Sequence, residues 1–129
     1  GGQPGGAPTN DRALHALERR AKALLPEFNS QDFGNFVWAV AKLRWQLQEL
    51  EPEALTAAFA ALVPRCKWRE LSMALWGLAT LGLPPPAAAL RTMAARLAGA
   101  EMELGPQGLP NVLWALARFD SPDAPREML

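Results

Sequence analysis

The stretch that decides the fold is NVLWALARF at residues 111–119, because MALWGLATL at 73–81 and NFVWAVAKL at 35–43 repeat its pattern. Each stretch has a tryptophan at the same place, and Trp38, Trp76 and Trp114 stand at equal intervals along the chain. A recurrence at a fixed period, here about 38 residues, is typical of proteins built from stacked repeats. One unit of such a protein is too small to bury its own apolar face, so it uses its neighbours as its core.

Composition limits the class of protein to which this chain can belong. The chain has 129 residues, half of them hydrophobic, which is enough for one domain with a packed core. Alanine, leucine and arginine are abundant and β-branched residues are few, which favours helix. No apolar run approaches the ~20 residues that a membrane span needs. We therefore expect an all-α domain that has no membrane partner.

The charged and reactive residues exclude several functions. Thirteen basic residues balance thirteen acidic ones, whereas strong phosphate binders usually carry a positive excess. Nucleic-acid binding therefore requires basic residues to gather on one face. The single cysteine, Cys66, excludes an internal disulfide and a cysteine-based zinc site. The single histidine, His15, offers no second histidine for a catalytic pair, and there is no glycine-rich phosphate loop. We predict no enzymatic activity, no cofactor and no metal.

Apolar residues at helical spacing predict two helices in the first unit. The first helix begins near Thr9 or Asn10 and ends at Pro26. The second helix covers about residues 31–44, with Ser30 as its cap. The predicted buried faces are Leu14, Leu17, Ala21 and Leu24 in the first helix and Phe33, Phe36, Val37, Val40 and Leu43 in the second.

The second and third units follow the same plan. Pro52 fits the first turn of a helix that Pro64 ends, and the partner helix stops at Gly82. In the third unit a loop over 99–105 precedes a helix at about 109–119, with a proline in its first turn. The predicted buried residues are Leu55, Phe59, Leu62, Leu71, Leu75, Leu78, Leu81, Leu90, Met93 and Leu97.

These units predict how the chain is organised. Residues 1–9 are rich in glycine and proline, which is typical of a flexible linker. Residues 10–121 are the predicted helical-repeat domain, and residues 122–129 look like the start of a truncated further repeat. The predicted fold is an all-α solenoid of about three two-helix repeats plus a partial fourth.

The repeated phrase resembles that of a known family. Units of about this length, with a Leu-Trp-Ala-Leu-Ala phrase in the second helix and a proline cluster opening the first, are similar to octotricopeptide repeat proteins. The stretch at 111–119 with its two counterparts, and the prolines at 84–86, carry the resemblance. The family's opening motif is Pro-Pro-Pro-Glu-Trp. Residues 84–86 lack the Glu, and Pro52-Glu53 lacks the Trp, so the second-helix phrase is the firmer match.

The resemblance implies an α-solenoid that binds RNA in a chloroplast or mitochondrion of a green alga. Members of the family act in transcript stability, processing, splicing or translation, and some look like structural parts of organellar ribosomes. The implied partners are single-stranded or ribosomal RNA and other proteins of an organellar ribonucleoprotein complex, without a small-molecule substrate. The alternative is a protein–protein scaffold subunit of an organellar assembly such as a ribosome. The neutral net charge and the alanine-rich first helices favour that alternative.

Basic residues on the first helices are the candidate RNA contacts. Arg12, His15, Arg19 and Lys22 follow helical spacing opposite the apolar stripe, which predicts a basic ridge. The ridge does not recur one period later, so a solvated face is the favoured alternative. The first helix of the third unit adds two arginines. The candidate RNA-binding residues are Arg12, Arg19, Lys22, Arg91 and Arg96.

The five tryptophans fall into two groups. Trp38, Trp76 and Trp114 lie among apolar residues and are each followed by a small residue, so we expect them in the core. The alternative is a series of stacking platforms for nucleic-acid bases. Trp45 and Trp68 lie outside the repeated phrase, near linkers, and are better candidates for a surface role.

Overall fold

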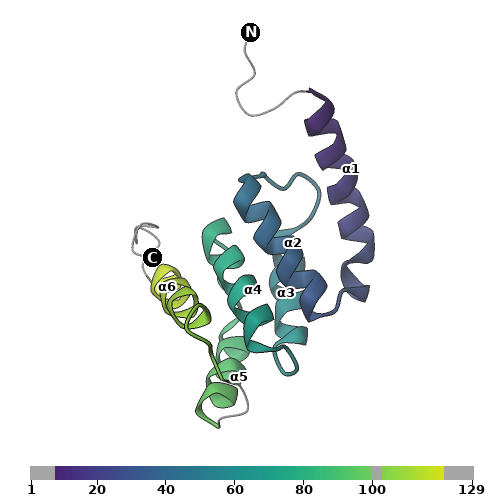
Figure 1. Cartoon of the computed structure of the whole chain (residues 1–129). Coiled ribbons are helices and arrows are strands. Elements are labelled where there is room, and N and C mark those ends of the chain that lie inside the picture. Colours follow the sequence, from purple (N-terminus) through teal and green to yellow (C-terminus); the bar gives the residue numbers. More distant parts are fainter. Residues whose placement is uncertain (1–7, 100–102, 121–129) are drawn as a thin grey trace.

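The chain is all-helical over the residues that its structure describes. A computed structural model describes the backbone of residues 8–99 and 103–120 and the side chains of all of these except 8–10. This part of the chain holds six α-helices, one turn of 3-10 helix and no strand, which confirms the all-α class (Figure 1). The further repeat predicted at 122–129 lies outside the described residues. The elements are α1 (Pro8–Leu24), η1 (Leu25–Glu27), α2 (Ser30–Leu43), α3 (Pro52–Leu62), α4 (Trp68–Leu81), α5 (Ala87–Ala98) and α6 (Gly108–Asp120).

Most helix ends lie where local signals predict them, with two differences. The cap of α2 is Asn29 and not Ser30, because Asn29 Oδ1 accepts a hydrogen bond from the Asp32 N–H at 2.7 Å. The N–H of Asn29 donates in return to Asp32 Oδ2 at 3.0 Å, which completes a capping box. α1 begins at Pro8, inside the predicted linker, since proline is tolerated in the first turn of a helix.

α2 and α4 correspond closely to each other. The two helices have equal length. The interval between their first residues, and the interval between their last residues, equals the interval between Trp38 and Trp76. The residue after each helix, Arg44 or Gly82, has a left-handed backbone with φ of 54° and 75°. Gly82 adopts this conformation without strain, as the sequence predicts for a helix stop. α6 fits less closely, since it begins and ends slightly later than the period would place it.

The helices form two layers. α2, α4 and α6 lie side by side in one layer, and α3 and α5 lie behind them (Figure 1). α1 lies beside α2 at one end of the molecule (Figure 1). This packing is compatible with a helical solenoid. The most deeply buried large side chains lie between the layers: Phe33, Val37, Leu55, Phe59, Val63, Leu71, Leu75 and Leu78.

α2 and α4 approach closely because glycines lie at their contact. A Cβ atom at Gly77 would lie 2.9 Å from the carbonyl carbon and oxygen of Val37, which real Cβ atoms do not tolerate. A Cβ at Gly34 would lie 3.2 Å from the carbonyl oxygen of Glu70. The absence of a side chain at Gly34 and Gly77 therefore allows the two helix backbones to pack closely.

The predicted buried faces are wrong at Leu17 and Leu43, both of which are exposed. These leucines border a groove of about 320 Å³ between α1 and α2, which no described helix fills. Helical spacing identifies residues that share a face, but it does not show whether a neighbouring helix covers that face.

One buried carboxylate joins α1 to the connection between α2 and α3. Glu18 Oε2 accepts hydrogen bonds from three successive backbone N–H groups, those of Gln48, Glu49 and Leu50, at 2.8, 2.6 and 2.8 Å. Its other oxygen accepts one from Trp45 Nε1 at 3.0 Å. Burial acts to raise the pKa of Glu18, but these hydrogen bonds outweigh it and leave the pKa below its ordinary value of 4.5. Glu18 is therefore a structural anion.

Candidate nucleic-acid interface

The basic ridge predicted on α1 is present at the surface. Arg12, Arg19 and Lys22 are exposed, and Arg19 Nη1 lies 3.5 Å from Glu49 Oε2. His15 packs edge-on against Trp45, with ring centroids 4.9 Å apart. The ridge lies at one end of the molecule, whereas α5, which carries the other two candidate arginines, lies at the opposite end (Figure 1). The fold therefore does not bring the five predicted residues together.

The two candidate arginines of α5 differ in their surroundings. Arg91 is exposed. Arg96 is half-buried, and its Nη1 donates hydrogen bonds to the carbonyl oxygens of Val63 at 2.8 Å and of Cys66 at 2.7 Å. Carbonyl groups that follow the end of a helix need such donors. Arg96 thus ties α5 to the connection between α3 and α4.

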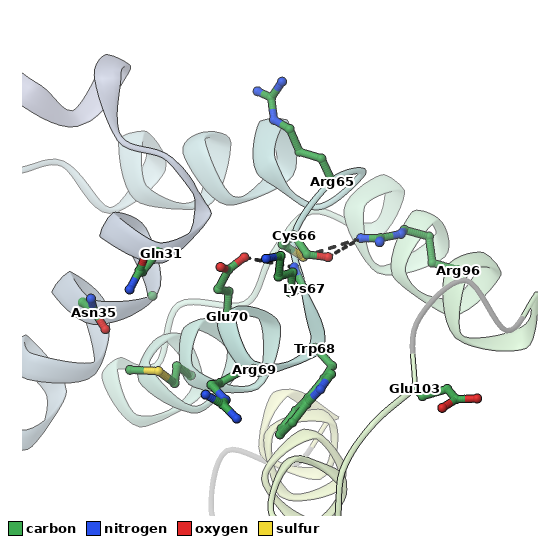
Figure 2. A pocket seen from close by; sticks show the side chains of 12 residues that line it. Gln31, Asn35, Arg65, Cys66, Lys67, Trp68, Arg69, Glu70, Arg96 and Glu103 are labelled. Carbon is green, nitrogen blue, oxygen red and sulfur yellow. Dashed lines mark hydrogen bonds between the residues drawn. The ribbon is translucent and has the colours of Figure 1, made fainter.

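A cavity of about 640 Å³ lies where the first turns of α2 and α4 meet the end of α5. Figure 2 shows Gln31 and Asn35 on the α2 side, Arg96 and Glu103 on the opposite side, and Lys67 between them. Three segments distant in sequence build it, and for this reason no local motif revealed it. Its polar and charged lining residues are Gln31, Asn35, Arg65, Lys67, Arg69, Glu70, Arg96 and Glu103.

Three basic residues form a sequence cluster at the start of α4, with the Arg65 and Arg69 side chains on opposite sides of Lys67 (Figure 2). Pro64 follows the end of α3, and the link to α4 then carries Arg65 and Lys67, with Arg69 in the first turn of α4 itself. All three side chains are exposed, and no described carboxylate lies within ion-pair distance of them. A helix N-terminus carries partial positive charge, so nearby cations destabilise the helix and nearby anions stabilise it. Side chains that oppose the stability of their own helix in this way are typical of a functional site.

The acidic residues of the cavity offset only part of the positive charge of this cluster. Glu70 Oε1 accepts a hydrogen bond from the backbone N–H of Lys67 at 3.0 Å, which helps to cap α4 (Figure 2). Glu103 is the other acid among the lining residues, against four basic ones. The cavity therefore has excess positive charge next to a helix N-terminus, an arrangement that suits a phosphate group.

Trp45 and Trp68, the predicted surface tryptophans, are half-buried and both have structural contacts. Trp45 is held by the hydrogen bond to Glu18. The Trp68 ring covers the turn that precedes α6 and the first residue of that helix, where Cβ atoms at Gly105 and Gly108 would lie 3.1 and 2.8 Å from the ring. The Arg69 guanidinium lies 5.4 Å from the centre of the Trp68 ring.

The prediction that the repeated tryptophans lie in the core is right for Trp114 and wrong for Trp38. Trp114 is 3% exposed, Trp76 is half-buried and Trp38 is 40% exposed. Trp38 follows the fully buried Val37, and a step of one residue turns a helix by about 100°, which moves the indole away from the core. Lys42 Nζ lies 5.5 Å from the Trp38 ring centre and 5.6 Å from that of Trp76.

In the described part of the chain, neither the single thiol nor the candidate metal-ligating side chains have an arrangement that supports reactivity or metal binding. Burial raises the pKa of the Cys66 thiol above its ordinary value of 9.0, although the neighbouring Arg96 acts to lower it, so the thiol is not activated. Among the described residues, no group of three or more His, Cys, Asp and Glu side chains is placed to hold a metal ion. None of the helices over 8–99 and 103–120 has the length and apolar character needed to cross a bilayer.

Comparisons of the chain with models of known protein families, with curated proteins and with solved structures found no match.

Proposed function

We propose that this chain is a segment of an α-solenoid of two-helix units, with a period of about 38 residues, that binds single-stranded RNA. The repeat arrangement is supported by the equal lengths of α2 and α4, by their offset of one period and by their matching left-handed ends. One backbone hydrogen bond at the start of each of α2, α4 and α6 gives further support. The carbonyl groups that accept these three bonds are spaced by the same period. These bonds are Phe33 N–H to Asn29 O, Leu71 N–H to Lys67 O and Leu109 N–H to Gly105 O.

The observation that carries RNA binding is the cluster of Arg65, Lys67 and Arg69 beside the cavity at the start of α4. Cationic side chains next to helix N–H groups are the usual partners of phosphate oxygens. A cavity of about 640 Å³ falls within the volume range of small-ligand pockets, which is compatible with a single nucleotide. In the proposed mode, the three basic residues hold the sugar–phosphate backbone.

Two amide side chains at the same cavity add the means to read a base. Gln31 and Asn35 lie one helical turn apart on α2, are exposed and line the α2 side of the cavity (Figure 2). An amide offers both donors and an acceptor, as the edge of an unpaired base does. The phosphate contacts then position the RNA, and the amides contribute preference among bases.

The cellular role follows from the resemblance to octotricopeptide repeat proteins. We propose a segment of an organellar protein that acts in RNA metabolism, translation or ribosome structure in a chloroplast or mitochondrion. The support is the phrase shared by residues 35–43, 73–81 and 111–119.

A salt titration of RNA binding tests the proposed function. A fluorescently labelled single-stranded oligonucleotide of mixed sequence is titrated with the chain, and anisotropy gives the affinity at each salt concentration. Three phosphate contacts on a single strand predict a slope of log K against log salt of about −2, or a loss of roughly tenfold to twentyfold between about 50 and 200 mM salt. Absence of binding at low salt would contradict the proposal and favour the protein–protein scaffold.

A further inference from the structure

A second, smaller cavity lies across the layer formed by α2, α4 and α6, which is called the front layer below. The cavity has a volume of about 240 Å³, and it is lined by Trp38 and Lys42 of α2, Met73 and Trp76 of α4, and Asn111 of α6. Because three successive helices contribute to it, the cavity lies within the stack and not at either end of it. None of these side chains takes part in the proposed phosphate contacts at the start of α4.

The α2 residues of this cavity face away from the core. Phe33 marks the core side of α2, since its ring lies 6.2 Å from that of Phe59 on α3. A helix turns by about 100° per residue, so Trp38 and Lys42 stand about 140° and 180° around α2 from Phe33. Lys42 is exposed, and Trp38 is 40% exposed. The cavity therefore opens on the surface of the front layer that faces away from α3 and α5.

That surface is the inner side of a curve. α2, α4 and α6 pack closely against one another, whereas α3 and α5 approach each other at only a few positions. A stack whose helices lie closer together in one layer bends toward that layer. Helical-repeat proteins bind extended ligands on the concave surface that such a bend creates.

The cavity brings two aromatic rings and one cation together. Lys42 Nζ lies between the ring centres of Trp38 and Trp76, at 5.5 and 5.6 Å. No carboxylate of the described residues lies within ion-pair distance of Lys42, so its charge is available to an anionic group. Because the stem of lysine is flexible, the ammonium group can move from the rings to a phosphate when a ligand enters.

This chemistry fits an unpaired nucleotide. Indole rings stack with bases of any kind, and a cation beside them can hold the adjoining phosphate. The volume of the cavity lies below the range of whole small-ligand pockets, so it suits a base and not a larger ligand. Asn111 adds an amide, which offers both donors and an acceptor to the edge of the base.

The cavity adjoins the larger one at the start of α4. Met73 lines both cavities. Asn35, which lines the larger cavity, lies about one helical turn before Trp38 on α2. The two cavities are therefore neighbours on one surface, and neighbouring nucleotides of one strand can reach both.

We propose that the smaller cavity is a second nucleotide site, in which an unpaired base of single-stranded RNA stacks on Trp38 and Trp76 and its phosphate pairs with Lys42. The inference rests on the proposed function, because it extends the path of the same strand from the start of α4 across the front layer. Trp114, the buried member of the tryptophan series, does not line this site.

An oligonucleotide without bases separates stacking from phosphate binding. The full 129-residue chain is titrated at about 50 mM salt with a labelled single-stranded RNA and with an abasic oligonucleotide of the same length. Trp38→Leu is expected to lose about fivefold or more in affinity for the RNA, because it loses a stacking ring, and to bind the abasic oligonucleotide as wild type does. Trp38→Phe keeps a ring and is expected to retain most of the affinity for RNA.

The salt dependence tests the role of Lys42. A fourth phosphate contact makes the expected slope of log K against log salt for wild type about −3, and Lys42→Gln is expected to return it to about −2. Arg44→Gln removes the same charge two residues further on, at an exposed position outside this cavity, and is the matched control that keeps the wild-type slope. Circular dichroism checks that each variant is folded.

Two results would each overturn the inference and leave the proposed function intact. The first is a folded Trp38→Leu that binds RNA as tightly as wild type does. The second is a salt slope that is the same for Lys42→Gln and Arg44→Gln. Failure of wild type to bind RNA at low salt is a different result, which would overturn the proposed function and this inference with it.

Discussion

The carboxylate of Glu18 lies 2.8 Å from the backbone nitrogen of Leu50, 32 residues further along the chain. This bond and its neighbours attach α1 to the connection between α2 and α3. A groove lies between the remaining part of α1 and α2. The buried anion therefore helps to fix the position of the first helix, and with it the shape of the groove.

Replacing Glu18 with glutamine is expected to lower the free energy of unfolding by about 1–3 kcal/mol, because backbone donors lose a charged acceptor. Urea denaturation measures the change. Glu27→Gln removes the same charge from an exposed position in η1 and is expected to change stability by less than about 0.5 kcal/mol. Equal effects of the two substitutions would contradict the structural role of Glu18.

The stabilisation by Glu18 is expected to depend on pH. Its pKa in the folded chain lies below the ordinary value of 4.5, so the folded state holds the ionised form more strongly than the unfolded state does. The contribution is then complete above pH 4.5 and is lost as the pH falls through the folded-state pKa. The difference in unfolding free energy between wild type and Glu18→Gln should shrink in acid. A difference that stays constant through the acid range would show that the charge of Glu18 is not the cause.

Gly77→Ala tests the close contact of α2 and α4. In an open helix this change stabilises by up to about 1 kcal/mol, because alanine favours helix. Here the added Cβ would lie 2.9 Å from backbone atoms of Val37, so we expect a net loss of about 1–3 kcal/mol. Gly34→Ala, where the nearest atom is 3.2 Å away, is expected to cost less. A thermal melt in which Gly77→Ala is more stable than wild type would show that the helices separate easily.

Arg96→Met is expected to destabilise the fold by about 1–3 kcal/mol, since the carbonyl groups of Val63 and Cys66 lose their donor. Arg91→Met makes the same change of charge at an exposed position of the same helix and serves as the control. Chemical denaturation of both variants measures the difference. If Arg96→Met kept wild-type stability but lost RNA affinity, Arg96 would be an RNA contact, as its place on a first helix suggests.

The helices were predictable because their ends depend on local chemistry. Pro64 and Gly82 stop α3 and α4 through effects that involve only a few neighbouring residues. Ser30 was the wrong cap because Asn29 pairs with Asp32, and this choice between adjacent polar residues depends on fine backbone geometry. The apolar spacing likewise identified the faces that Val37 and Leu75 bury.

The cavity and the anion were not predictable in the same way. Gln31, Arg65 and Arg96 approach one another only when three helices pack. Glu18 stands among the charged residues of α1, and nothing in its neighbours separates it from a solvated glutamate. Leu17 has the same spacing as a buried leucine, and its exposure follows from the absence of a described helix over the groove.

The central claim is that RNA binds at the start of α4 and not wherever positive charge is exposed. Two triple variants with equal formal charge separate these possibilities: Arg65→Gln, Lys67→Gln, Arg69→Gln against Arg12→Gln, Arg19→Gln, Lys22→Gln. Their affinities for one labelled single-stranded RNA are compared with that of wild type at about 50 mM salt. We predict that the α4 variant loses about tenfold or more in affinity and shows a flatter salt dependence, while the α1 variant stays within about twofold of wild type. Equal losses in the two variants, or a greater loss in the α1 variant, would contradict the claim.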